Sequence, residues 1–421
     1  MTEPSPASAE PGREATNAVF ASLRRHLSPG AALAAKVIGG GASEEAASGA
    51  TVTLSDGRSA LDFGSYGVAL LGHRHPAVVA ALAAQLERMP TATRVLANPV
   101  TAAFSAELAE RCGEPLRRVW LGSDGADAVE AALKLARRQS GRMRVLAVEG
   151  AFHGKTLGAL ALSANPAFRA GLEPLLGEVS LLARDDPEAV RREAADGDVA
   201  ALIFEPVQGE SGVHTLGPDL LRRWAADARA AGSFVISDEV QVGLGRCGPF
   251  SLAETLAIKP DAVLFGKALG GGLMPLSAVV ATDALAQPLI ADPTWHTATF
   301  GGHPLACAAG RAALVALDRA AGQGAKVSAL LEAGLRSLAG ANPEAIVEVR
   351  GRGLIWGVEM ATPGAAGSAL VELAQHGLLV SPCLSSNTTI RLLPPMVTSA
   401  EEVERALAIL DAILPSLGPY L

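Results

Sequence analysis

Between residues 115 and 280, short apolar segments alternate with stretches that are long enough to form a helix. Two parallel strands must be joined by a crossover of about a dozen residues or more, and this crossover is usually helical. The alternation therefore predicts an α/β fold with a large, doubly wound and mostly parallel sheet. The segments expected to form its strands are 117–121, 144–148, 199–204, 233–237, 262–265 and 277–280.

The rest of the chain is expected to form a tail and a second, smaller domain. Asp56 and Gly57 mark a hairpin turn between two β-prone runs. Near the other end, the spacing of Ser399 and Glu402 predicts a helix that begins with a capping box. The expected parts are a disordered tail rich in Pro, Ser, Ala and Glu (1–15), a large α/β domain (65–324) and a small α+β domain (16–64 with 325–421).

Three of the predicted strands are followed by a residue that can carry a charge. Glu205 follows the third strand, Asp238 the fourth, and Lys267 comes shortly after the fifth. Ligands of open α/β sheets bind outside the carboxyl ends of the strands, so we expect these side chains to share one crevice, with Gln241 close by. A lysine among apolar neighbours loses solvation, which lowers its pKa and leaves a neutral amine that can attack a carbonyl.

A phosphate site is expected where residues 122–128 lead into an amphipathic helix. Small residues at Gly125 and Ala126 allow the backbone to approach an anion, and the first free amides of the helix can bind it. A carboxylate about 4 Å from a phosphate would cost roughly 4 kcal/mol at an effective dielectric constant near 20. We therefore expect Asp124 to cap the helix and to face away from the anion.

Together these residues describe a site for pyridoxal 5'-phosphate. Lys267 would hold the aldehyde as a Schiff base. Asp238 would pair with the pyridine nitrogen and keep it protonated, so that the ring can act as an electron sink. The other residues expected to bind the cofactor are Phe152 and Val240 on the two ring faces, His153 beside Phe152, Gln241 at the ring oxygen and Glu205 in the surrounding polar network.

Six motifs make the chain resemble a known family from about residue 50 to the end. They are LGHRHP (71–76), EPVQGE (205–210), SDEVQ (237–241), GKALGGG (266–272), TFGG (299–302) and RLLPP (391–395). The chain resembles the class III aminotransferases of fold type I, and among them the putrescine, acetylornithine and ornithine aminotransferases. The resemblance implies a homodimer with shared active sites, in which Thr299 of the partner subunit reaches the cofactor phosphate. It also implies that Asp124 replaces a serine or threonine, so that phosphate binding depends on the amides of Gly125 and Ala126, with Ser123 as a helper.

The resemblance extends to substrate binding. Arg391, on a predicted strand, can bind a carboxylate through two hydrogen bonds. In the resembling family this arginine binds 2-oxoglutarate or glutamate, and Glu210 would be the gate that pairs with it; a permanent bridge between the domains is the alternative. Lys155 stands where acetylornithine and ornithine aminotransferases carry an arginine for the α-carboxylate, which favours a donor without a nearby carboxylate. The alternative interpretation is that Lys155 is an ordinary solvated residue with no role in donor choice. Tyr66 is expected to line the substrate pocket.

The resemblance implies an aminotransferase that works by a ping-pong cycle. The expected donor is an ω-amine, a diamine or an ornithine-like compound, and the expected acceptor is 2-oxoglutarate. Alternatives within this chemistry are an enzyme that aminates an aldehyde or ketone from glutamate, or one of the acetylornithine or diaminobutyrate type. Because a fold does not fix a reaction, a mutase, racemase or lyase and a catalytically silent binding protein stay open as other classes.

Composition limits the partners. The chain of 421 residues has a formal net charge of −8 and no long basic stripe, which argues against nucleic acid and anionic membranes. Its four cysteines show neither a CxxC pair nor metal-ligand spacing, so we expect reduced thiols and no metal. Neither a signal-peptide pattern nor a membrane-spanning apolar run is present. We expect a cytoplasmic enzyme whose partners are small-molecule substrates and a second copy of itself.

Overall fold

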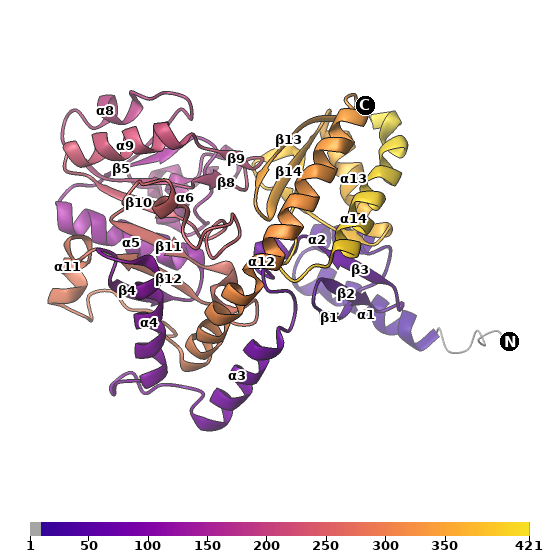
Figure 1. Ribbon diagram of the computed structural model, residues 1–421, viewed down its shortest axis with the longest axis horizontal. Helices are drawn as coiled ribbons and strands as arrows, with labels where there is room; N and C mark the ends of the chain where they lie inside the picture. The colour runs from indigo at the N-terminus through magenta and orange to yellow at the C-terminus, as the bar shows by residue number, and fades with distance from the viewer. Residues whose placement is uncertain (1–9, 421) are drawn as a thin grey trace.

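The computed structural model describes residues 10–420, with side chains from residue 15 onwards. Its largest sheet has seven strands (Figure 1). β12 runs antiparallel to both of its neighbours, and the remaining neighbours pair in parallel. In spatial order the strands are β4 (Arg118–Gly122), β12 (Ser277–Ala281), β11 (Ala262–Phe265), β10 (Phe234–Asp238), β7 (Val199–Phe204), β5 (Arg144–Val148) and β6 (Val179–Leu182). The predicted α/β class with a mostly parallel sheet is confirmed.

Helices cover both faces of this sheet because alternate residues of each strand point to opposite sides. In β11, Val263 and Phe265 belong to a core shared with α4 and α12, whereas Ala262 and Leu264 pack with α5 and α11. Toward β5 and β6, Trp224 of α9 fills a third core against residues of β7 and α8. The helices of this part are α3 (Pro76–Arg88), α4 (Pro99–Cys112), α5 (Gly125–Ser140), α6 (Leu157–Leu162), α7 (Pro166–Arg169), α8 (Ala189–Glu193), α9 (Pro218–Ala230), α10 (Leu252–Thr255) and α11 (Asp283–Ala291).

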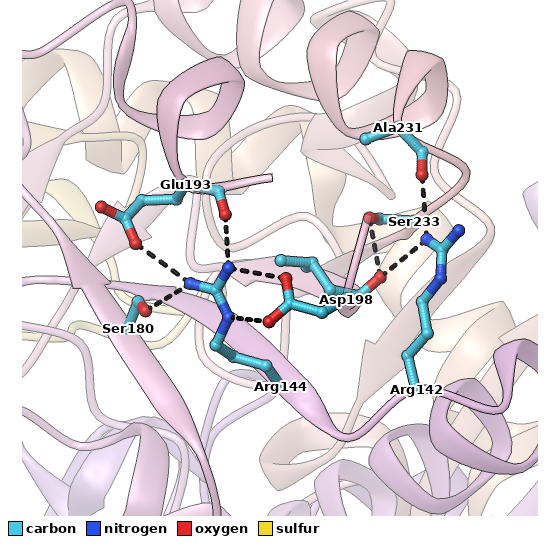
Figure 2. Close-up of polar contacts among 8 residues, drawn as sticks. Arg142, Arg144, Ser180, Glu193, Asp198, Ala231 and Ser233 are labelled. Carbon is cyan, nitrogen blue, oxygen red and sulfur yellow. Dashed lines mark hydrogen bonds and ion pairs between the residues drawn. The ribbon is translucent and has the colours of Figure 1, made fainter. Parts of the chain in front are cut away.

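Two arginines, Arg142 and Arg144, form hydrogen bonds and ion pairs at the amino ends of the strands (Figure 2). Arg144, the first residue of β5, makes a two-pronged contact with Asp198, with Nε–Oδ2 and Nη2–Oδ1 distances of 2.8 and 2.7 Å. Its Nη1 donates to Ser180 Oγ and to Glu193 Oε2. Arg142 donates to the carbonyls of Val199 and Ala231 at 3.1 and 2.9 Å. These contacts lie at the end of the sheet opposite the carboxyl ends of the parallel strands. They therefore stabilise the sheet far from the site described below.

A smaller part lies beside the large sheet, and α12 connects the two (Figure 1). It contains a sheet of order β1-β2-β3-β15 and a sheet of order β13-β14-β17-β16, and the short pair β8-β9 lies in the connection after β7. The strands are β1 (Glu44–Ser48), β2 (Thr51–Leu54), β3 (Ser59–Asp62), β8 (Val207–Gln208), β9 (His214–Thr215), β13 (Ile346–Arg352), β14 (Ile355–Met360), β15 (Leu378–Leu379), β16 (Ser381–Cys383) and β17 (Ser386–Leu392). The helices are α1 (Glu10–His26), α2 (Pro29–Ile38), α12 (Pro304–Ala341), α13 (Pro363–Gln375) and α14 (Ala400–Ile413). Ser399 and Glu402 form the predicted capping box of α14.

Two sequence expectations differ from the structure. The predicted disordered tail is wrong for residues 10–15, because α1 begins at Glu10, and residues 1–9 lie outside the described residues. The predicted boundary between residues 324 and 325 falls inside α12, which continues unbroken for 38 residues. Ala and Leu, the strongest helix formers, dominate this stretch, and no proline interrupts it after the first turn. The two parts of the molecule therefore share one rigid element.

Further observations concern membranes, metals and thiols. Within residues 10–420, no helix combines the length and apolarity needed to cross a membrane. The same residues contain no cluster of three or more His, Cys, Asp or Glu side chains suited to hold a metal ion. Cys112, Cys247, Cys307 and Cys383 are all buried and unpaired.

Candidate active site

One cavity of about 160 Å³ lies at the carboxyl ends of the parallel strands. Glu205 directly follows β7, Asp238 ends β10, and Lys267 follows β11 after a single glycine. The predicted convergence of these three side chains is what the structure shows. The cavity is lined by Gly125, Ala126, Phe152, His153, Gly154, Glu205, Glu210, Asp238, Val240, Gln241 and Lys267.

Lys267 has an unusual backbone and an unusual amine. Its φ angle of 45° places it in the left-handed region, which costs free energy for any residue other than glycine. Burial lowers the pKa of its amine to about 8, an effect that the nearby carboxylate of Glu210 opposes and that Arg391 strengthens. A larger fraction of this amine is therefore neutral near pH 7 than of a surface lysine.

A buried acid–histidine pair lies deeper in the cavity wall. His153 Nδ1 is 2.7 Å from Asp238 Oδ2, and Asp238 Oδ1 accepts from the Val240 amide at 3.1 Å. Burial disfavours charge on His153, but the hydrogen bond and charge of Asp238 outweigh it and raise the pKa of the imidazole. Glu205 Oε1 accepts from the Phe152 amide at 2.8 Å, and burial raises the pKa of Glu205 to about 7. His153 and the Val240 amide therefore hold the Asp238 carboxyl group in a fixed orientation at the cavity.

The amino end of α5 closes another side of the cavity. Asp124 caps the helix by accepting from the Asp127 amide at 3.1 Å, as expected, and Asp127 in turn accepts from the Ser123 amide at 2.9 Å. Gly125 and Ala126 occupy the first two helical positions, where no helical carbonyl accepts the amide hydrogen. Both residues line the cavity, so this end can bind an anion through the backbone.

The cavity wall leaves no room for a side chain at Gly125 or at Gly154. A Cβ atom on Gly125 would lie 2.8 Å from Val240 Cγ1, and one on Gly154 would lie 2.7 Å from Ala126 Cβ. A partly neutral lysine, a fixed carboxylate and free helix amides thus surround one narrow space. This donor set fits pyridoxal phosphate, which needs an amine for its aldehyde, an acid for its ring nitrogen and an anion site for its phosphate.

A second buried acid–base pair adjoins the cavity. Arg391 Nη1 lies 2.7 Å from Glu210 Oε1 and also donates to Gln241 Oε1 at 3.0 Å and to the Gly209 carbonyl at 2.8 Å. Gln241 Nε2 donates to Glu210 Oε1 at 3.1 Å. The charge of Arg391 outweighs burial and lowers the pKa of Glu210. The Nε and Nη2 atoms of Arg391 are buried and find no hydrogen-bond partner among the described residues, which leaves one edge of the guanidinium for a ligand carboxylate.

Five residues predicted for the site do not line the cavity, and one of them is Arg391, which is buried and pairs with Glu210 as described above. Ser123 is engaged through its amide with Asp127. Tyr66 is 65% exposed, and Thr299 is also exposed. Lys155 is exposed and holds its ammonium 4.1 Å from the ring centroid of Phe168. Their roles in binding stay predictions.

The structure also adds a contact that the sequence analysis missed. The amide of Leu384 donates to Glu210 Oε2 at 3.2 Å, and the amide of Ser385 donates to the Glu210 carbonyl at 2.8 Å. Asn165 holds this turn through the Leu384 carbonyl at 3.1 Å. No sequence signal identifies the turn residues, because they take part in all three contacts through backbone atoms. The turn between β16 and β17 thus helps to hold the acid that pairs with Arg391.

Comparisons with known proteins agree with this geometry. The family model described as aminotransferase class-III matches residues 40–414. The putrescine aminotransferase of Pectobacterium atrosepticum is 37% identical over 420 residues, covering 95% of this chain and 89% of the relative. The ornithine aminotransferase structure from Toxoplasma gondii ME49 has a TM-score of 0.87 at 30% identity and covers 96% of both chains. An amine transaminase from an uncultivated Pseudomonas species, in its PLP-bound form, has a TM-score of 0.82 at 27% identity and covers 90% of this chain and 95% of that chain.

Proposed function

The chain belongs to the class-III aminotransferases, transaminases that use pyridoxal phosphate, and we propose that it carries the amino group of an ω-amine to 2-oxoglutarate. The expected donor is a diamine or an ornithine-like compound. The observation that carries this proposal is the single cavity shared by Lys267, Asp238 and the amino end of α5. Membership in this family favours a transaminase over the lyase, mutase and binding-protein alternatives.

Different residues of the cavity would bind the aldehyde, the ring nitrogen and the phosphate of the cofactor. When bound, pyridoxal phosphate supplies an aldehyde for the amine and a ring that withdraws electrons from the reacting carbon. Lys267 Nζ would hold the cofactor by its aldehyde and, as a partly neutral amine, would take and return the transferred proton. Asp238 would hold the ring nitrogen and its proton, while His153 fixes the orientation of Asp238. Gly125 and Ala126 bind the phosphate through their amides.

The remaining residues of the cavity surround the ring and its substituents. Phe152, Val240 and Gln241 all line the cavity. Phe152 and Val240 would hold the two faces of the ring, and Gln241 would donate to its oxygen. Glu205 is the acceptor that holds the Phe152 amide in place. Ser123 assists at the phosphate.

Arg391 and Glu210 form the acceptor site of the proposed cycle. While the amine donor is bound, Glu210 neutralises Arg391, so that the donor site presents no uncompensated cation. When 2-oxoglutarate enters, its distal carboxylate pairs with the free Nε and Nη2 edge of Arg391. Leaving such buried donors unpaired costs free energy, so a dicarboxylate is favoured over a monocarboxylate.

The donor assignment is supported by what lies at residue 155. A lysine held against the Phe168 ring offers no planar fork for an α-carboxylate. A terminal amine far from a carboxylate does not need that fork. The 37% identical relative that bears the name putrescine aminotransferase points to the same donor class. Tyr66 lines the donor pocket in this proposal, and Lys155 lies at its rim.

We propose that the active enzyme is a homodimer with shared sites. Phe300, Val95 and Leu96 are 64%, 89% and 73% exposed, which is typical of a surface that a second copy covers. Thr299 lies on this surface and does not line the cofactor cavity of the same subunit. In the dimer, Thr299 of the partner subunit completes the phosphate site. The four buried free thiols suit the reducing cytoplasm, where we place the enzyme.

A panel of amines with 2-oxoglutarate, with glutamate as the readout, tests this proposal. We expect the highest kcat/KM for putrescine or ornithine and a lower value for N-acetylornithine. Pyruvate, a 2-oxo acid with a single carboxylate, should be a much poorer acceptor than 2-oxoglutarate. If α-amino acids without a terminal amine react and terminal amines do not, the donor assignment is wrong. The reverse reaction, in which glutamate aminates an aldehyde, is measured with the same enzyme and decides the favoured direction.

A further inference from the structure

Side chains of the same chain hold the loop that carries Thr299 by its backbone carbonyls. The loop comprises residues 296–302, between α11 and α12. Trp120 Nε1 donates to the His296 carbonyl at 3.1 Å, and Thr101 Oγ1 donates to the Gly302 carbonyl at 2.7 Å. Arg94 acts at the centre of the loop, where its Nη1 donates to the carbonyls of Thr299 at 3.1 Å and of Gly301 at 2.8 Å.

The two glycines press this loop against the large sheet and α4. A Cβ atom on Gly301 would lie 2.4 Å from the Leu121 carbonyl oxygen. Gly302 has a φ angle of 70°, and its Cβ would lie 2.8 Å from Thr101 Cγ2. One side of the loop is therefore fixed by close backbone contact. The part nearest Thr299 depends on Arg94.

Arg94 is itself held in an uncommon conformation. It lies in the irregular segment between α3 and α4, with a φ angle of 62°. Non-glycine residues keep such angles where surrounding contacts fix them, and these sites are often functional. The exposed Val95 and Leu96 follow it directly, and Phe300 follows Thr299. Arg94 thus joins two loops of the surface that we assign to the dimer.

We propose that Arg94 is a positioning residue for the cofactor bound by the partner subunit. By fixing the carbonyls of Thr299 and Gly301, it sets the direction of the Thr299 hydroxyl before the two subunits and the phosphate meet. This inference rests on the shared site proposed above. The ordering of the loop is complete within one subunit, so the phosphate contact does not have to supply it.

A charged donor suits this task. A guanidinium makes stronger hydrogen bonds to carbonyls than a neutral donor does, and one Nη atom can serve two acceptors with its two hydrogens. Lysine has a single flexible ammonium and reproduces the charge without the fixed plane. A replacement by lysine therefore separates the positioning role from a general attraction between Arg94 and phosphate.

The test is a double-mutant cycle on cofactor affinity in the full-length protein. Arg94→Ala, Thr299→Ala and the double variant are made in a Lys267→Ala background, which removes the covalent attachment and brings the dissociation constant into a measurable range. Pyridoxal phosphate is titrated, and tryptophan fluorescence reports its binding. Pyridoxal without the phosphate is the ligand control, and Arg88→Ala is the matched arginine control, because Arg88 is an exposed arginine at the end of α3. Sedimentation velocity records the oligomeric state of each variant.

We expect Arg94→Ala and Thr299→Ala each to raise the Kd of pyridoxal phosphate about tenfold, with the double variant no weaker than Thr299→Ala alone. Pyridoxal affinity and Arg88→Ala should stay unchanged, and Arg94→Lys should recover only part of the affinity. An effect of Arg94→Ala that persists in full beside Thr299→Ala, or an unchanged Kd in Arg94→Ala, overturns the inference. So does a monomeric Arg94→Ala, which would assign Arg94 to the interface alone. If Thr299→Ala itself leaves the Kd unchanged, the proposed shared phosphate site is wrong, and the inference about Arg94 is wrong as a consequence.

Discussion

Nδ1 of His153 lies 2.7 Å from Oδ2 of Asp238, and both side chains are almost entirely shielded from solvent. The contact joins the segment after β5 to the end of β10 and fixes the acid that faces the cofactor cavity. A buried carboxylate without such a partner would be costly. The pair therefore links the stability of the fold to the chemistry of the site.

Replacing His153 tests this link. We expect His153→Leu to lower the free energy of unfolding by about 1–3 kcal/mol, since it leaves Oδ2 of Asp238 without its side-chain partner, and to lower kcat as well. The pKa of His153 is raised in the folded protein, so its contribution is complete below pH 6.5 and fades as the pH rises through the folded value. Chemical unfolding of both proteins between pH 5 and 9 measures this difference. A stability difference that grows with pH would contradict the assignment.

The acceptor site is tested by separating the two half-reactions. Arg391→Lys keeps the charge but loses the Nε and Nη2 edge, so kcat/KM for 2-oxoglutarate should fall roughly 100-fold, or about 2.7 kcal/mol. The half-reaction with the amine donor should change much less. In Glu210→Gln the competing charge is gone, and the KM for 2-oxoglutarate should fall. Stopped-flow absorbance of the cofactor follows each half-reaction, and equal losses in both by Arg391→Lys would refute a dedicated acceptor site.

The lowered pKa of Lys267 predicts how the apoprotein takes up its cofactor. The reactive form is the neutral amine, so the rate of uptake should rise with pH around a midpoint of about 8, well below the ordinary value of 10.5. Glu205→Gln removes a nearby negative charge that raises the pKa of this lysine, and should therefore move the midpoint to lower pH. Uptake is measured by cofactor absorbance after rapid mixing. A midpoint near 10 in the wild-type protein would show that the amine is not desolvated.

The lowered pKa of Lys267 also makes the stability of the apoprotein depend on pH. Between pH 8 and 10.5 the unfolded chain binds more protons at Lys267 than the folded chain does, so the apoprotein should gain stability as the pH rises through this range. Lys267→Met removes this gain and serves as the comparison. Denaturant midpoints at several pH values provide the measurement. Parallel pH profiles of the two proteins would argue against burial of the amine.

Arg144 gives a control for effects that act through the fold alone. Arg144→Ala removes the contacts to Asp198, Ser180 and Glu193 at the amino ends of the strands (Figure 2). The Tm should fall measurably, while cofactor affinity and both half-reactions stay within about twofold, because distant sites act independently. Calorimetry and cofactor titration check the two parts. A large loss of cofactor affinity would mean that the two edges of the sheet are coupled.

Sequence patterns were sufficient for the central sheet where strands are buried on both faces. The residues of β7 and β11 are all buried, and such strands form continuous apolar runs. β6 was not predicted, because it is an edge strand with three of its four residues at least partly exposed. The unbroken length of α12 was missed as well, since its glycines, such as Gly322 and Gly324, look like breaks.

The site shows a similar division. Asp238 and Lys267 were identifiable because they come just after predicted strands, yet Glu239 next to Asp238 is an equally acidic candidate. The structure shows that Glu239 turns away and accepts from the amides of Leu252 and Ala253 at the start of α10. Contacts made by the backbone, such as that of the Leu384 amide with Glu210, leave no trace in residue types. The sequence was sufficient to predict which residue types lie at the site. The directions in which neighbouring side chains point, as for Asp238 and Glu239, could be learned only from the folded structure.

The most direct test of the account is to locate the cofactor on the chain. The holoenzyme is reduced with borohydride, digested and sequenced by mass spectrometry, which distinguishes Lys267 from the five other lysines: Lys36, Lys134, Lys155, Lys259 and Lys326. We predict a phosphopyridoxyl group on Lys267 alone and none in Lys267→Ala. A modified peptide from another lysine, or a protein that reduction leaves unlabelled, would contradict the assignment of this cavity as the active site.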